Sequence, residues 1–158
     1  MASSSSTSRI RYDVFLSFRG EDTRDNFAYY LYKALLEKGI HTFRDDDEIE
    51  GGQKVMAELM DSIEESKCSV IVISKNYASS TWCLNELVKI LERGKLGQKI
   101  YVTFYRVDPS DVRKQAGEFG KGFSQAVSKN QPSAQKWKDA LVEIVGLKGW
   151  VYPKPGYG

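Results

Sequence analysis

The chain has 158 residues, of which 41% are hydrophobic and 28% are charged, as expected for one globular domain that folds without disulfides or metals. The formal net charge is +2, which is too small to indicate binding to nucleic acid or to an anionic membrane surface. Cys68 and Cys83 are too few for a disulfide framework, and no apolar segment is long enough to span a membrane. We therefore expect a cytoplasmic or nucleocytoplasmic protein without a membrane contact.

The chain begins with a serine-rich segment that is followed by a strand and a helix. Residues 1–10 offer little to bury, so we predict a disordered leader. Residues 12–18 are mostly apolar strand formers and predict a central buried strand. The apolar residues of 27–35 have helical spacing, and Gly39 ends that helix.

Strands and helices then alternate along the chain. The predicted elements are a strand at 40–44, a helix at 55–63, a strand at 68–74, a helix at 82–93, a strand at 100–105, and helices at 118–128 and 133–147. Residues 150–152 are a candidate edge strand. This alternation predicts an α/β three-layer sandwich with a five-stranded parallel sheet, and it favours the flavodoxin-like order 2-1-3-4-5. We expect the domain to occupy residues 11–150, followed by a tail at 151–158.

Sheets of this order bind ligands at the carboxyl ends of the first and third strands. The loop after the third strand, residues 75–81, leads into the helix that carries Trp82 and Glu86. These two residues are one helical turn apart, so they place a flat aromatic surface beside a negative charge, which suits a planar cation. A second interpretation stays open from the residues alone: Glu86 is an exposed carboxylate stabilised by the helix dipole, and Trp82 is a core aromatic.

The loop after the first strand has a similar ambiguity. Arg19 and Gly20 lie between a strand and a helix, where backbone N–H groups and a guanidinium are able to hold an anion. The alternative is an ordinary turn in which Gly20 supplies conformational freedom.

Other polar clusters favour structural roles. The acidic run Asp45–Glu48 lacks the alternating ligand spacing of a calcium loop, so we expect no metal there. His41 is the only histidine, and Cys83 has no evident imidazole partner, which argues against a Cys–His nucleophile. The third strand ends at Ser74 without the aspartate that a phospho-receiver needs. Residues 108–111 predict a turn and a helix cap.

Five segments in the same order resemble motifs of plant TIR (Toll/interleukin-1 receptor) domains. They are residues 12–24, 39–43, 63–66, 77–87 and 107–113. The resemblance extends from about Arg11 to Trp150. It implies the TIR fold and an N-terminal signalling domain of an intracellular immune receptor that continues into nucleotide-binding and leucine-rich-repeat regions.

The resemblance also implies an enzymatic activity, the release of nicotinamide from NAD+ or NADP+ to give ADP-ribose-type signals for defence and cell death. The dinucleotide is then a substrate, and no further cofactor is expected. The family's catalytic glutamate corresponds to Glu86. Its pocket residues correspond to Phe18, Arg19, Gly20, Ser80 and Trp82. Because nicotinamide leaves as a neutral molecule, no general acid is needed, and one carboxylate is enough to stabilise an oxocarbenium-like sugar.

The resemblance further implies self-association with other TIR domains and a homo-oligomer on activation. Plant members often carry Ser-His on the first helix at a self-association surface, where this chain has Tyr29 and Tyr30. The terminal helix from Trp137 to Gly149 is a second candidate surface. The loop at 47–53, which in this family helps to close the site between subunits, is acidic here. An alternative function is a non-enzymatic module for homotypic TIR–TIR interaction.

Overall fold

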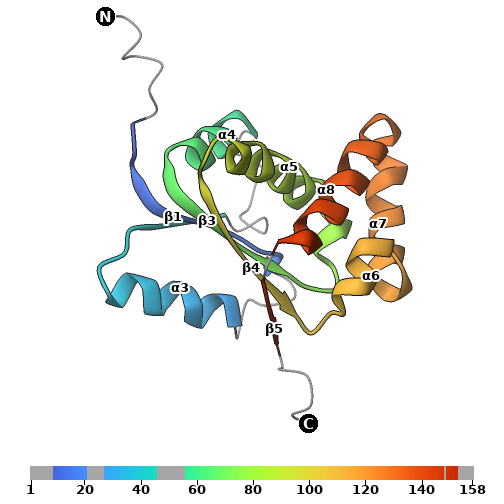
Figure 1. Cartoon of the computed structure of the whole chain (residues 1–158), viewed down its shortest axis with the longest axis horizontal. Coiled ribbons are helices and arrows are strands. Elements are labelled where there is room, and N and C mark those ends of the chain that lie inside the picture. Colours follow the sequence, from blue (N-terminus) through green and yellow to red (C-terminus); the bar gives the residue numbers. More distant parts are fainter. Residues whose placement is uncertain (1–8, 21–26, 46–55, 148, 153–158) are drawn as a thin grey trace, which may run out of the picture.

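The computed structural model describes residues 9–20, 27–45, 56–147 and 149–152. Its strands are β1 (Tyr12–Ser17), β2 (Thr42–Asp45), β3 (Ser66–Ile73), β4 (Lys99–Tyr105) and β5 (Gly149–Tyr152). They form one parallel sheet in the order β2-β1-β3-β4-β5 (Figure 1), which confirms the predicted fold class, strand order and edge strand. Because β5 ends at Tyr152, the first two residues of the predicted tail belong to the sheet.

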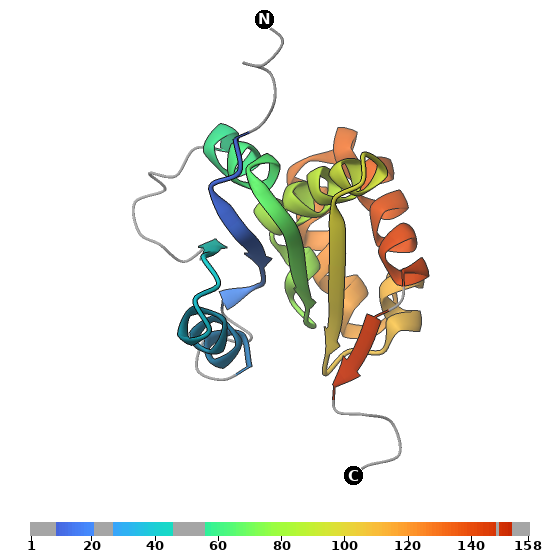
Figure 2. The same cartoon turned by 60° about the vertical axis from the view of Figure 1, so that its left-hand side comes forward.

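Helices cover both faces of this sheet. They are α3 (Phe27–Glu37), α4 (Met56–Glu64), α5 (Thr81–Lys95), α6 (Pro109–Lys114), α7 (Gly117–Lys129) and α8 (Ala134–Gly146), with short 3-10 helices η2 (Tyr77–Ser79) and η3 (Gln131–Ser133). Figures 1 and 2 show α3 on one side of the sheet and α4, α5 and α8 on the other.

The alternation of side chains along β1 explains the two layers of core. Phe15 belongs to the large apolar cluster on the side of α4, α5 and α8. The next residue, Leu16, belongs to a smaller cluster that includes Ala28 of α3. Successive side chains of a strand point to opposite faces, so a strand with helices on both faces must be apolar throughout. This requirement confirms that the apolar run at 12–18 is a central strand.

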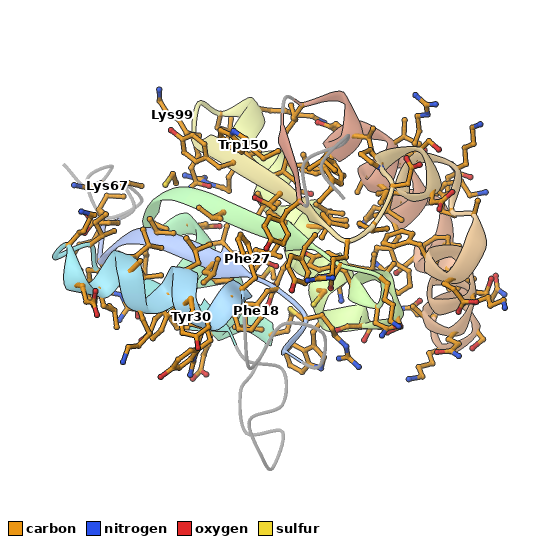
Figure 3. All side chains as sticks on the ribbon, turned by 90° about the horizontal axis from the view of Figure 1, so that it is seen from below. Phe18, Phe27, Tyr30, Lys67, Lys99 and Trp150 are labelled. Atoms are coloured by element: carbon orange, nitrogen blue, oxygen red, sulfur yellow. The ribbon has the colours of Figure 1, made fainter. Side chains whose placement is uncertain are left out.

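Aromatic side chains gather on the β4–β5 half of the face that carries α3. Tyr105 and Tyr152 stack with ring centroids 5.5 Å apart, and Phe27 stacks on Tyr105 at 5.2 Å. Farther along the same face, Trp150 is 61% exposed beside Tyr101. Phe27 and Trp150 are labelled in Figure 3. Among the described residues, this half of the face therefore has a buried aromatic ring, that of Tyr105, and three exposed ones, those of Tyr101, Trp150 and Tyr152.

Gly149 stands where β5 passes close to β4. A Cβ atom built on it would lie 2.5 Å from Cγ1 of Val102 and 2.7 Å from the carbonyl oxygen of Val102. We therefore expect Gly149→Ala to lower the free energy of unfolding by about 1–3 kcal/mol, because overpacking displaces the edge strand. Urea unfolding measures this change.

Gly146→Ala is the matched control for that variant. Gly146 ends α8, and a Cβ atom there has no neighbour within 4 Å. Because alanine favours a helix, this substitution is expected to leave stability unchanged or to raise it by up to about 1 kcal/mol. Equal effects of the two substitutions would contradict the packing explanation for Gly149.

Candidate functional site

The helix that carries Glu86 begins at a serine cap. Ser80 adopts an extended backbone, and its Oγ accepts a hydrogen bond from the backbone N–H of Cys83 at 3.1 Å. An N-cap of this kind satisfies one of the N–H groups that lack a partner in the first turn. Ser80 was predicted to bind substrate, and in the structure its hydroxyl oxygen fixes the start of α5.

Glu86 lies in the second turn of α5 and faces the end of β1. Its side chain is 0% exposed, and its Oε1 accepts a hydrogen bond of 2.6 Å from the hydroxyl of Ser17, the last residue of β1. The interpretation of Glu86 as an exposed helical carboxylate is therefore wrong. The helix turns this residue toward the sheet, at the carboxyl edge where parallel sheets bind ligands.

The hydroxyl of Tyr77 and the backbone carbonyl of Cys83 continue this network. The hydroxyl of Tyr77 lies 2.8 Å from Oγ of Ser17 and 3.2 Å from the carbonyl oxygen of Cys83. Tyr77 belongs to η2, directly after β3, and is fully buried. The network thus joins β1, η2 and α5 around one carboxylate.

The other residues predicted to bind substrate differ in how far they are accessible to a ligand. Trp82 is half-buried, one turn before Glu86 on α5. Arg19 is half-buried and Gly20 is buried, directly after Phe18. The ring of Phe18 packs in the cluster on the side of α3, so it presents almost no surface to a ligand. Residues 21–24 of this predicted loop lie outside the described residues.

The sequence interpretation missed Ser17 and Tyr77 as members of the site. Ser17 had one local signal, because it is a polar residue within an apolar strand, and buried polar groups need hydrogen-bond partners. Tyr77 had no such signal, since tyrosine is common both in cores and on surfaces.

A cavity of about 270 Å³ opens at the carboxyl ends of β3 and β4. It is lined by Ser74, Lys75, Tyr105 and Arg106. Lys75 and Arg106 are exposed, and the guanidinium of Arg106 lies 5.4 Å from the ring centroid of Tyr105. This part of the ligand edge therefore offers two cations and an aromatic ring.

The two predicted self-association surfaces differ in the structure. Tyr30 on α3 is 65% exposed, and its ring lies 5.6 Å from the ring of Tyr29, which is also exposed. Figure 3 shows Tyr30 directed away from the sheet. Trp137 on α8 is instead 0% exposed, and its Nε1–H donates to Oδ1 of Asn85 at 3.1 Å. The assignment of Trp137 to a contact surface is wrong, because its ring fills the space between α8 and α5. The predicted helix is also too long, since α8 ends at Gly146 and Gly149 begins β5.

Two other expectations concern only part of the chain. Within residues 9–20, 27–45, 56–147 and 149–152, no helix has the length and apolarity needed to cross a bilayer. The same residues contain no cluster of three or more histidine, cysteine or acidic side chains suited to a metal ion. The acidic loop at 47–53 and most of the run at 45–48 lie outside the described residues, as does most of the predicted leader.

A parallel sheet of order 2-1-3-4-5 with a buried carboxylate at its ligand edge defines the class of fold, and comparison with known proteins defines the family. A model of the TIR domain family matches residues 11–154, and the chain belongs to this family. The predicted resemblance is thereby confirmed.

Relatives of this chain include plant resistance proteins. The chain is 53% identical over 154 residues to disease resistance protein RPV1 of Vitis rotundifolia, and 51% identical over 153 residues to TMV resistance protein N of Nicotiana glutinosa. Each alignment covers 94% of this chain but only 11% of RPV1 and 13% of protein N. The chain therefore spans about an eighth or less of the length of these relatives.

A solved relative has the same fold. It comes from the activated Roq1 resistosome, an assembly described as directly recognising the pathogen effector XopQ. The TIR domains of that assembly superpose on this chain with a TM-score of 0.79 at 48% identity. The superposition covers 93% of this chain and 91% of that chain.

Proposed function

We propose that this chain is the TIR signalling domain of a plant disease-resistance receptor and that it cleaves nicotinamide from NAD+ or NADP+ when it self-associates. The observation that carries the proposal is the Glu86 carboxylate, buried at the ligand edge and hydrogen-bonded by Ser17. The ADP-ribose-type products would signal defence and cell death in the cytoplasm or nucleus. The likeness to RPV1 and protein N supports the receptor assignment.

One carboxylate is chemically sufficient for this reaction. The pyridinium of NAD+ already carries a positive charge, so nicotinamide leaves as a neutral molecule without a proton from an acid. The ribose then develops oxocarbenium character, and a fixed negative charge beside it lowers the barrier. Glu86 would supply that charge, and water would complete the hydrolysis at the sugar carbon.

The surroundings of Glu86 fit the rest of a dinucleotide. Trp82 offers a half-buried ring one turn away, which suits stacking on a flat base. Arg19 follows β1, and Lys75 and Arg106 line the cavity at the ends of β3 and β4, so these cations suit a pyrophosphate along the same edge of the sheet. These groups come from the ends of three neighbouring strands, the usual arrangement of a ligand site in an open α/β sheet.

The complete burial of Glu86 explains why activity would depend on self-association. A substrate reaches a carboxylate that is 0% exposed only after the site opens. The reaction therefore needs a form of the chain in which Glu86 is accessible, and assembly would have to favour that form. The related TIR domains of Roq1 come from an assembly that is described as activated, which supports this link.

Self-association is expected to depend on Tyr30. Its exposed ring and that of Tyr29 form an aromatic pair on α3, a residue type that concentrates binding energy in interfaces. We expect Tyr30→Ala to weaken self-association by about tenfold, and to lower nicotinamide release at a fixed protein concentration. Sedimentation velocity over a concentration series measures the association.

Leu96→Ala is the control for Tyr30→Ala. Leu96 is also an exposed apolar residue, but it lies at the C-terminal end of α5. This variant is expected to associate like the wild type. If Tyr30→Ala associates as strongly as the control, α3 is not the contact surface.

The second candidate function is a non-enzymatic module that recruits other TIR domains, which the exposed Tyr29–Tyr30 pair favours. This function predicts that a cell-death assay in leaves loses its response with Tyr30→Ala and keeps it with Glu86→Gln. The enzymatic function predicts that both variants lose the response. The Glu86→Gln result therefore separates the two functions.

A further inference from the structure

A buried chain of two hydroxyl groups ends on Glu86. Ser17 donates to Oε1 of Glu86 at 2.6 Å, and the hydroxyl of Tyr77 lies 2.8 Å from Oγ of Ser17. All three side chains are fully buried, and they come from β1, η2 and α5. Buried polar groups that converge from three separate elements constrain one another, because none can move without losing a hydrogen bond.

Counting hydrogens gives the direction of this chain. Each hydroxyl carries one hydrogen, and an ionised carboxylate only accepts. The hydrogen of Ser17 is therefore used on Glu86, and the contact between Ser17 and Tyr77 needs the hydrogen of Tyr77. The Tyr77 hydroxyl also donates to the carbonyl oxygen of Cys83 at 3.2 Å, so its one hydrogen is shared between two acceptors, of which Oγ of Ser17 is the nearer. The carbonyl oxygen of Cys83 also lies within α5, where carbonyl groups accept backbone N–H groups.

We propose that Ser17 and Tyr77 are positioning residues for the reaction, with Ser17 holding Oε1 of Glu86 directly and Tyr77 orienting Ser17. This inference rests on the proposed function of Glu86. A hydrogen bond to an ionised acceptor is among the strongest in a protein, and it fixes the carboxylate with respect to the ribose. Neither hydroxyl exchanges a proton with the substrate, so their effect reaches the reaction only through Glu86.

The test uses Ser17→Ala, Tyr77→Phe and the double variant in a nicotinamide-release assay under forced assembly. We expect Ser17→Ala to lower kcat by about 10- to 100-fold and to change the KM for NAD+ by less than about twofold. Tyr77→Phe should have a smaller effect on kcat. Because Tyr77 acts through Ser17, it should have no further effect in the Ser17→Ala background. Ser17→Thr, which keeps the hydroxyl, should recover most of the lost rate.

Two matched controls remove the same groups elsewhere. Ser69 is a fully buried serine on β3, opposite Phe15 of β1, and its hydroxyl has no hydrogen-bond partner in the described structure. Tyr12 begins β1, at the end away from Ser17. We expect Ser69→Ala and Tyr12→Phe to keep the wild-type kcat.

A spectroscopic measurement tests the same contact without activity. The infrared difference between the wild type and Glu86→Gln isolates the carboxylate band of Glu86. This band should shift in Ser17→Ala and, less strongly, in Tyr77→Phe, but not in Ser69→Ala. If Ser17→Ala fails to fold, the carboxylate band of Tyr77→Phe, which retains Ser17, is compared with those of the wild type and Ser69→Ala instead.

The outcomes separate this inference from the proposed function. If Glu86→Gln is inactive while Ser17→Ala and Tyr77→Phe match the controls in both kcat and infrared band, the positioning role is wrong and the function stands. If Glu86→Gln is as active as the wild type, or the assembled wild type is inert, the function fails and the positioning role fails with it. If the losses of kcat in Ser17→Ala and Tyr77→Phe add in the double variant, Tyr77 does not act through Ser17.

Discussion

Replacing Glu86 with glutamine is expected to lower nicotinamide release from NAD+ by at least about 100-fold, the usual loss when a group that stabilises transition-state charge is removed. Glutamine has nearly the same volume, and its amide oxygen can still accept the hydrogen bond from Ser17 that now reaches Oε1. The substitution therefore removes the negative charge and keeps the packing. The rate of nicotinamide formation, followed by chromatography, measures the effect.

Glu92→Gln is the control for this prediction. Glu92 lies on the same helix as Glu86, but it is exposed. Its substitution removes the same charge from α5 without touching the buried network, so the rate should stay at the wild-type level. Melting temperatures close to that of the wild type would show that both variants are folded. A Glu86→Gln protein with undiminished activity would remove the basis of the proposed mechanism.

Trp137→Ala is expected to have the largest effect on stability, with a loss of about 3–5 kcal/mol in the free energy of unfolding. Trp137 is fully buried between α8 and α5, and its indole N–H is bonded to Asn85. The substitution leaves a large cavity and an amide oxygen without its donor. Denaturant unfolding measures the loss, and Trp137→Phe should cost less because it removes the hydrogen bond but keeps most of the apolar volume.

Trp150→Ala provides the comparison for the core tryptophan. Trp150 is 61% exposed on β5, so its removal should change stability far less than the removal of Trp137. If Trp137→Ala instead kept the wild-type stability and abolished self-association, Trp137 would be a contact residue after all. Asn85 is next to Glu86 on α5, so the hydrogen bond from Trp137 of α8 also supports the helix that carries the carboxylate.

Most of the fold was predictable because its signals are local. The apolar run at 12–18 and the strand pattern at 68–74 depend on which residues are able to lie between two layers of helices. The cap predicted at 108–111 is present, with Oδ1 of Asp108 accepting from the N–H of Ser110 at 2.8 Å at the start of α6. Such a cap involves neighbours two residues apart, so a single sequence contains all of it.

The site was predictable only in its location. Alternating strands and helices fix the edge at which loops converge, and this argument alone leads to the helix of Glu86. The burial of Glu86 and its bond to Ser17 depend on how α5 packs against β1, between residues 69 positions apart. No local pattern encodes that approach. Trp137 was misassigned for a similar reason, since a tryptophan on an amphipathic helix gives no sign of which neighbour covers it.

The central claim is that Glu86 is the catalytic carboxylate of an assembly-dependent nicotinamide-releasing enzyme. Chromatography of NAD+ incubated with the wild type and Glu86→Gln, each over a range of protein concentrations, tests it most directly. We predict that nicotinamide release per wild-type molecule rises with concentration while Glu86→Gln stays at the background. The claim would be contradicted if the two proteins released nicotinamide equally at every concentration, or if neither protein released any.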